Sequence, residues 1–160
     1  MRRASLSLEN RFQCFQWSDM TANQSVHEDQ YTHGKPFVKA KIAILNPVNS
    51  RQTTIHADFW IDTGFDGGIH VSQSYETEIA SLGLDLWQGN IGVAGGKTDR
   101  VNRCLAYLQQ IGDRELPSPG VETEIVFHGA DRYGLLGLDI LRNWIIAFDG
   151  PNQFFRITRP

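Results

Sequence analysis

One acidic residue, Asp62, stands where a carboxylate could do hydrolytic chemistry. It follows the apolar run Phe59-Trp60-Ile61 and opens the tripeptide Asp62-Thr63-Gly64, with Gly67 and Gly68 close behind. These glycines allow backbone conformations that other residues resist. We therefore expect a strand to deliver Asp62 into a turn at the end of a rigid element, where catalytic groups are held accurately. An equally simple interpretation is an aspartate that organises its own turn by accepting hydrogen bonds from nearby backbone amides.

The segments that would position this aspartate have the pattern of short β-strands. Alternating β-forming residues predict strands over residues 37–45 and 53–61. We expect a helix that begins near Ser72 or Ser74, either of which could cap it, and ends at Gly83. Many short strands, frequent turns and little helix together predict an all-β sandwich or barrel. The other predicted elements are strands over residues 121–127, 144–148 and 154–157 and a short helix over residues 139–143.

A glycine pair predicts a β-hairpin in the middle of the chain. Gly95-Gly96 falls between Ile91-Gly92-Val93-Ala94 and a long second arm over residues 101–111. Taken alone, this pattern indicates an ordinary hairpin turn. Residues 113–120 are charged and contain prolines, so we expect a loop there.

The first part of the chain differs from the rest in composition. Residues 1–34 are polar and irregular, and they predict a flexible or loosely docked extension that Phe12, Phe15 and Trp17 could anchor. Residues 35–160 are expected to form one domain, as the length of 160 residues suggests.

Overall composition excludes several classes of function. The chain is 41% hydrophobic and 21% charged with a net charge of −3, so it lacks the basic excess typical of nucleic-acid binding. No apolar run approaches the roughly 18 residues of a membrane span. The start of the chain lacks the apolar segment of a secretory signal. We therefore expect a cytoplasmic protein with no nucleic-acid or membrane partner.

Neither the cysteines nor the histidines show the spacing of a metal site, so no metal or other cofactor is expected. Cys14 and Cys104 are too few for a disulfide framework and too far apart for a zinc motif. The histidines lack a helical pair four residues apart and are expected to be surface or hydrogen-bonded side chains. They are His27, His33, His56, His70 and His128.

Three features occur in the order seen in one family. The stretch from Phe59 to Gly67 resembles the catalytic loop of retropepsin-like aspartic proteases of the cellular, single-domain type. The stretch from Leu135 to Leu141 is similar to that family's second signature, and the Gly95-Gly96 hairpin between them resembles its flap. The resemblance covers about residues 36–158. Four apolar residues of the two signatures are expected in the core: Trp60, Ile61, Leu135 and Leu136.

The resemblance implies a retropepsin-like closed β-barrel or sandwich with one or two short helices and a flap hairpin. It also implies aspartic endopeptidase activity, with Asp62 as the catalytic acid. Thr63 would hydrogen-bond across a dimer axis, and Gly64 would let the substrate backbone approach.

The same resemblance implies roles in substrate binding. Asp66 would bond the main chain of the peptide, although a solvated loop carboxylate is an equally good interpretation. Gly95 and Gly96 would form the tip of the flap and exclude water from the bound peptide.

The chain holds a single Asp-Thr-Gly tripeptide, so the resemblance implies a homodimer in which a second Asp62 completes the site. Leu138 stands where viral members carry an arginine, and both ends of the chain differ from theirs. These departures keep open an alternative, a catalytically silent peptide-binding or dimerisation module. A further alternative is that the extension occupies the cleft as an inhibitory segment.

Overall fold

The computed structural model describes residues 25–46, 52–84, 86–93, 95–130 and 132–158, with side chains from residue 27 onward. Most of the predicted extension, including Phe12, Cys14, Phe15 and Trp17, lies outside the described residues. The predictions of its anchoring and of an inhibitory role therefore remain predictions.

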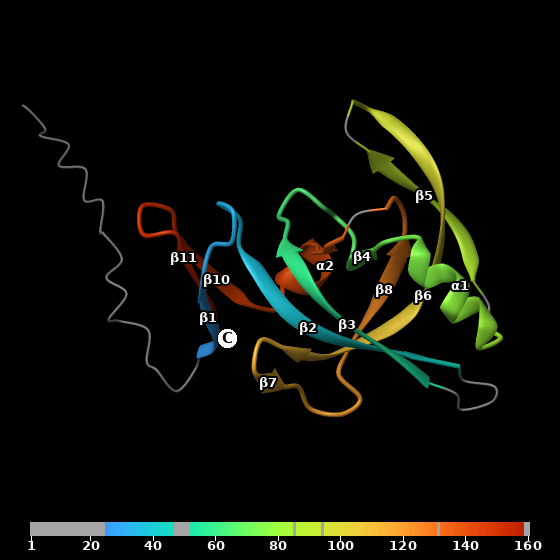
Figure 1. Ribbon diagram of the computed structural model, residues 1–160, viewed down its shortest axis with the longest axis horizontal. Helices are drawn as coiled ribbons and strands as arrows, with labels where there is room; N and C mark the ends of the chain where they lie inside the picture. The colour runs from blue at the N-terminus through green and yellow to red at the C-terminus, as the bar shows by residue number, and fades with distance from the viewer. Residues whose placement is uncertain (1–24, 47–51, 85, 94, 131, 159–160) are drawn as a thin grey trace, which may run out of the picture.

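The described chain is mostly β structure, 58% strand and 10% helical, with a closed six-stranded barrel (Figure 1). Strand β2 closes the barrel because it pairs antiparallel with β3 on one side and with β6 on the other. The predicted all-β barrel with short helices is therefore confirmed. In order around the barrel the strands are β2 (Phe37–Leu45), β3 (Gln52–Ile61), β9 (Gly134–Leu136), β4 (Ile69–Val71), β8 (Val121–Phe127) and β6 (Lys97–Ile111).

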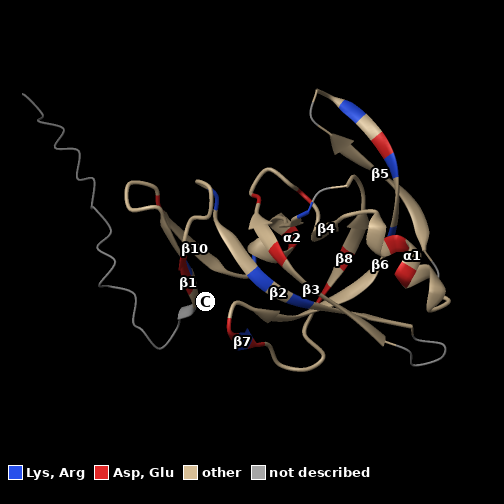
Figure 2. Cartoon of the chain, viewed as in Figure 1, with Lys and Arg blue, Asp and Glu red and all other residues tan. Residues whose placement is uncertain are grey.

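The predicted hairpin joins the barrel through its long second arm. Strand β5 (Trp87–Val93) pairs antiparallel with the first half of β6, and Gly95 and Gly96 take φ angles of +86° and +73° in the turn. The hairpin extends beyond the barrel on the side where β3 ends (Figure 1). Figure 2 shows basic and acidic residues close together on its β6 arm. At its other end, β6 pairs with β7 (Arg114–Glu115), a short strand within the predicted loop over residues 113–120.

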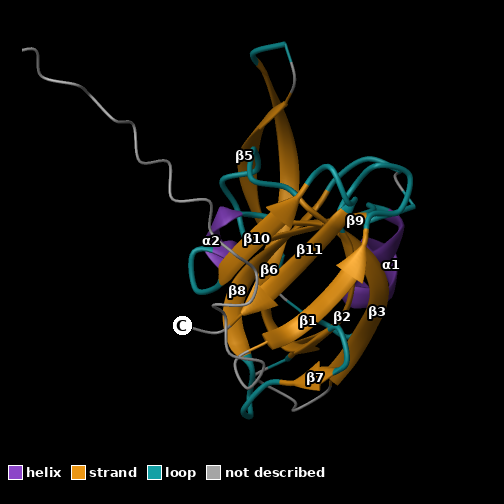
Figure 3. Cartoon of the chain, turned by 90° about the vertical axis from the view of Figure 1, so that its left-hand side faces the viewer, coloured by secondary structure: helices purple, strands orange, loops and turns teal. Residues whose placement is uncertain are grey.

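A second, three-stranded sheet contains both ends of the described chain. Strand β11 (Phe154–Thr158) lies between β1 (Ser25–Gln30) and β10 (Ile145–Asp149), and both pairings are antiparallel (Figure 3). Residues 25–30 were expected to belong to the loosely docked extension and are instead a paired strand. Their sequence, SVHEDQ, gives no apolar alternation, so the strand depends on backbone bonds to β11, whose Phe155 and Ile157 are fully buried.

The barrel core follows the alternation of its strands, and this corrects two of the four core predictions. Ile61 and Leu136 are buried as predicted, with exposures of 3% and 0%. Trp60 and Leu135 are only half-buried. Side chains of a strand alternate between its faces, so Trp60 points outward while its neighbours point inward. The Lys35 ammonium lies 3.5 Å from the centre of the Trp60 ring, as in a cation–π contact.

Two short helices, α1 (Ser74–Ser81) and α2 (Leu138–Leu141), complete the described fold. The N-cap of α1 is Gln73 and makes no side-chain capping bond, so the prediction of a Ser72 or Ser74 cap is wrong. The Ser72 hydroxyl, one residue before the N-cap, instead accepts a hydrogen bond of 3.3 Å from the amide of Ser74, the first residue of the helix. Within the described residues, neither helix has the length and apolar character needed to cross a membrane.

The His27 side chain on β1 packs closely against Phe155 and Gly112. Its ring lies 5.7 Å from the Phe155 ring and rests on Gly112, where an added Cβ would stand 2.1 Å from the imidazole Nδ1. Burial lowers the pKa of His27 below its usual value of 6.5, and the nearby carboxylates of Asp29, Asp113 and Glu28 oppose this shift only in part. Folding therefore favours the neutral ring.

This burial predicts a pH-dependent part of the stability. Below about pH 6.5 the unfolded chain takes up a proton that folded His27 resists, so the free energy of unfolding falls as the pH drops. We expect the wild type to lose more stability than His27→Gln between about pH 7.5 and 5.5 in urea unfolding experiments, because only the wild type carries the histidine. A stability difference between the two proteins that does not change with pH would contradict this account.

Candidate active site

Asp62 lies directly after β3 and is held by its own turn and by β9. Its amide donates a 3.0 Å hydrogen bond to the Leu136 carbonyl, which continues the parallel pairing of Ile61 with Leu136. The carboxylate Oδ1 accepts a 2.9 Å bond from the Gly64 amide. The turn-organising role that the sequence allowed is thus present, while the side chain stays only half-buried and accessible.

The loop after Asp62 is bound along its length to the segment that opens α2. The Gly137 amide donates to the Gly68 carbonyl at 2.8 Å and the Leu138 amide to the Phe65 carbonyl at 2.8 Å. The Asp139 amide donates to the Gly67 carbonyl at 3.2 Å. The two segments that carry the sequence signatures, far apart along the chain, therefore form one backbone-bonded unit.

Gly137 permits this close approach, and Gly68 permits the loop to lie against β8. A Cβ on Gly137 would lie 2.2 Å from the Gly67 carbonyl oxygen and 2.6 Å from that of Phe65. A Cβ on Gly68 would lie 1.9 Å from the Thr123 hydroxyl. These distances are far below van der Waals contact, so a larger residue at Gly137 would separate the two segments, and one at Gly68 would move the loop away from β8.

The other predicted site residues lie at the surface around this unit. Thr63, Gly64 and Asp66 are exposed in the loop. Gly95 and Gly96 are exposed at the tip of the hairpin, which the fold places on the same side of the barrel (Figure 1). The structure thus brings Asp62, Thr63, Gly64 and Asp66 together in one loop, and the hairpin tip belongs to a separate element.

Beneath the loop lies a cluster of rings that sequence reasoning missed. His70 on β4 is 5% exposed, and its ring meets the Phe65 ring edge-on at 6.2 Å. On its other side the His128 ring lies 5.8 Å away. The apolar neighbours Ile69 and Val71 could have signalled that His70 is buried, since all three residues of this short strand are buried.

Cysteine-based catalysis and a metal centre find no support among the described residues. Cys104 is 2% exposed, and burial raises the pKa of its thiol to about 12, so it is not a nucleophile. No group of three or more His, Cys, Asp or Glu side chains in the described part of the chain is arranged to hold a metal ion.

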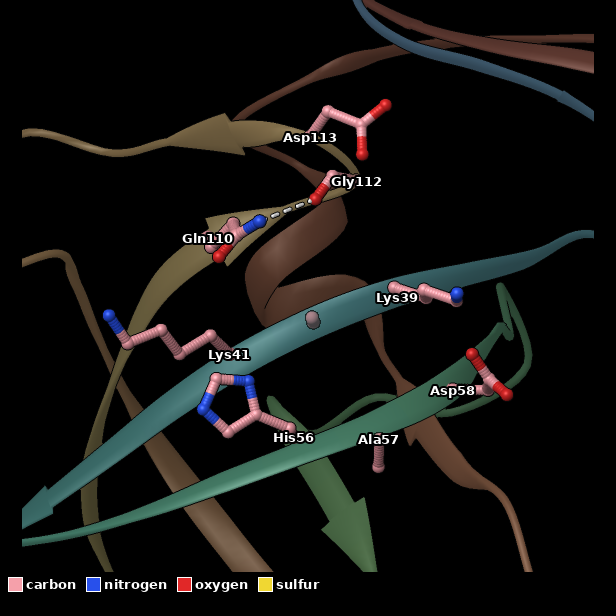
Figure 4. Close-up of a pocket in the computed structure, with 9 residues that line it drawn as sticks. Lys39, Lys41, His56, Ala57, Asp58, Gln110, Gly112 and Asp113 are labelled. Atoms are coloured by element: carbon pink, nitrogen blue, oxygen red, sulfur yellow. Dashed lines mark hydrogen bonds between the residues drawn. The ribbon is translucent and has the colours of Figure 1, made fainter.

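A groove on the outer face of β2 and β3 contains no residue of the Asp62 loop (Figure 4). Lys39 and Asp58 extend to one side of it and Lys41 extends to the other. Because Lys41 lies away from Lys39 and Asp58, the three charged groups do not gather at one point of this groove. The described side chains around it include Lys39, Lys41, His56, Asp58, Gln110 and Asp113.

In comparisons with known proteins, no protein-family model, no curated protein and no solved structure matches this chain. The retropepsin-like family inferred from sequence resemblance therefore remains a prediction.

The contact between the two segments predicts a specific effect on stability. Gly137→Ala should lower the free energy of unfolding by about 1–3 kcal/mol, because the new methyl group overlaps backbone atoms that cannot rotate away. Gly92→Ala is the matched control, since a Cβ added at Gly92 would have no atom within 4 Å. Urea unfolding of both variants tests the prediction, and equal stabilities would show that the segments separate at little cost.

Proposed function

We propose that the chain is one half of a homodimeric aspartic endopeptidase whose active site contains two copies of Asp62. The observation that supports this most is the accessible Asp62 carboxylate at the end of β3, in a loop tied by backbone bonds to residues 137–139. Such a mounting fixes a carboxylate on a rigid scaffold, as catalysis requires.

The proposed chemistry uses two carboxyl groups that share one proton. Two like carboxylates held close together do not both ionise, so one Asp62 is charged and its partner is protonated. The charged member takes a proton from a bound water as that water's oxygen attacks the carbonyl carbon of the peptide. The protonated member donates to the carbonyl oxygen, which gives a tetrahedral intermediate. Transfer of a proton to the amide nitrogen then lets the C–N bond break, and no covalent enzyme intermediate forms.

A second copy of the chain has to supply the second carboxylate. The Asp-Thr-Gly tripeptide occurs once in the sequence. Exposed apolar side chains occur on α2 and β10: Leu138, whose amide bonds the loop, is 38% exposed, and Ile145 and Phe148 on β10 are 49% and 44% exposed. Strand β10 is an edge of its sheet, with only β11 paired to it among the described strands. An antiparallel edge can pair with itself about a two-fold axis, so we place the dimer contact on α2 and β10.

The proposed substrate is an extended peptide between the Asp62 loop and the hairpin. Exposed backbone at Thr63 and Gly64, with the Asp66 carboxylate, would bond the peptide main chain as a strand is bonded. Gly95 and Gly96 would cover the peptide from the other side and exclude water. Peptide recognition of this kind needs no cofactor.

A second candidate function is a catalytically silent peptide-binding or dimerisation module. The bond from the Gly64 amide to Asp62 Oδ1 favours it, because this bond gives the aspartate a structural task that needs no catalysis. The two functions differ in whether removing the charge of Asp62 changes a reaction rate.

Asp62→Asn tests the proposed activity. The amide keeps the side-chain shape but cannot share a proton, so peptide hydrolysis should fall by about a hundredfold or more. Cleavage of a mixed peptide library between about pH 4 and 7, followed by mass spectrometry, measures this effect. Cleavage at equal rates by both proteins would point to another active site or to a contaminant. Absence of cleavage by both, at concentrations where the protein is dimeric, would favour the silent module.

Ile145→Asp tests the proposed dimer surface. A charge buried at a two-fold contact would raise the dimer dissociation constant by about tenfold or more. Leu105→Asp is the matched control, because Leu105 is 50% exposed on the barrel strand β6, outside α2 and β10. Analytical ultracentrifugation over a range of concentrations compares the two variants, and equal effects would rule out β10 as the specific contact.

A further inference from the structure

Besides the pairing of β6 with β8, three side chains on the β6 arm link the β5–β6 hairpin to the body of the molecule: Asp99, Asn102 and Arg103, which bonds Glu124 on β8. Asp99 Oδ2 lies 3.0 Å from His128 Nε2. Nearer the barrel, the Asn102 amide donates a 2.6 Å bond to Glu76 Oε1 on α1. Asp99 is the contact closest to the hairpin tip, so it constrains the position of the tip most directly.

The backbone of His128, the partner of Asp99, is held in place by the barrel. It follows β8 directly, and its own amide donates a 3.1 Å bond to the Val71 carbonyl on β4. The imidazole is 31% exposed, so it is anchored through the backbone while its outer nitrogen faces the hairpin.

The other face of His128 leads to the proposed active site. Its ring lies 5.8 Å from the ring of buried His70, which in turn meets the Phe65 ring at 6.2 Å. Phe65 is part of the Asp62 loop, and its carbonyl accepts the bond from Leu138. A continuous series of contacts therefore runs from the hairpin, through Asp99, His128 and His70, to the loop.

We propose that Asp99 and His128 form a clamp that positions the hairpin with respect to the Asp62 loop. The two are positioning residues, and their role in peptide turnover rests on the proposed function. The described titratable groups facing the His128 ring are Asp99 from β6 and His70 from β4. A carboxylate can only accept a hydrogen bond, so the His128 ring donates to Asp99 through Nε2.

Hydrogen exchange of the full-length protein tests the clamp without any need for activity. Asp99→Ala and His128→Phe should each raise the exchange rate of the amides of residues 95–101 by about threefold to tenfold, after correction for intrinsic rates. His128→Phe keeps a ring beside His70, and the double variant should exchange no faster than either single variant. Lys97→Ala, an exposed neighbour on the same arm, is the control and should exchange like wild type.

A conservative variant separates the clamp from a general loss of packing. Asp99→Asn retains a hydrogen-bonding side chain without the charge, so its hairpin exchange should be intermediate between those of wild type and Asp99→Ala. Wild-type exchange in the single variants, or fully additive effects in the double variant, would overturn the clamp. If the hairpin responds as expected but no peptide is cleaved, the clamp stands and the proposed function fails. If peptide is cleaved and hairpin exchange is unchanged, the clamp fails alone.

Discussion

The position of the Asp62 loop in the fold depends on the backbone hydrogen bonds between residues 65–68 and residues 137–139. The bond between Gly68 and Gly137 extends the antiparallel pairing of β4 with β9, and together the bonds join parts of the chain separated by about half its length. Because Gly137 leaves no room for a side chain against Phe65 and Gly67, the contact depends on shape as well as on hydrogen bonding. The position of Asp62 is set by this contact, since its own amide bonds the Leu136 carbonyl at the start of the joined region.

The contact between residues 65–68 and residues 137–139 differs in the burial of its neighbours on its two sides. On the barrel side Phe65 of the loop packs against His70 on β4, a strand whose residues are all buried. On α2 and β10 the apolar side chains Leu138, Ile145 and Phe148 are exposed. A carboxylate held by the backbone bonds of its loop, in a chain with such exposed apolar side chains, fits the proposed site shared between two copies.

The sequence predicted the features whose signal is local. Strong alternation located β2, β3 and β8, and the Gly95-Gly96 pair located the hairpin. The strand β1 was missed because its residues are polar and it forms only through β11, far along the chain. Half-burial of Trp60 and Leu135 was missed because an apolar run does not show which residues point outward. The contacts among Asp99, His128 and His70 depend on tertiary structure alone, and no spacing of these residues in the sequence predicts them.

Mixing wild-type and Asp62→Asn chains at constant total concentration tests the central claim most directly. If each site needs one charged and one protonated Asp62 from two copies, mixed dimers are inactive and hydrolysis falls with the square of the wild-type fraction. Equal amounts would then leave about one quarter of the activity, given free exchange of subunits between identical two-fold interfaces. A fall in simple proportion, to about one half, would contradict the account, because each chain would then be working alone.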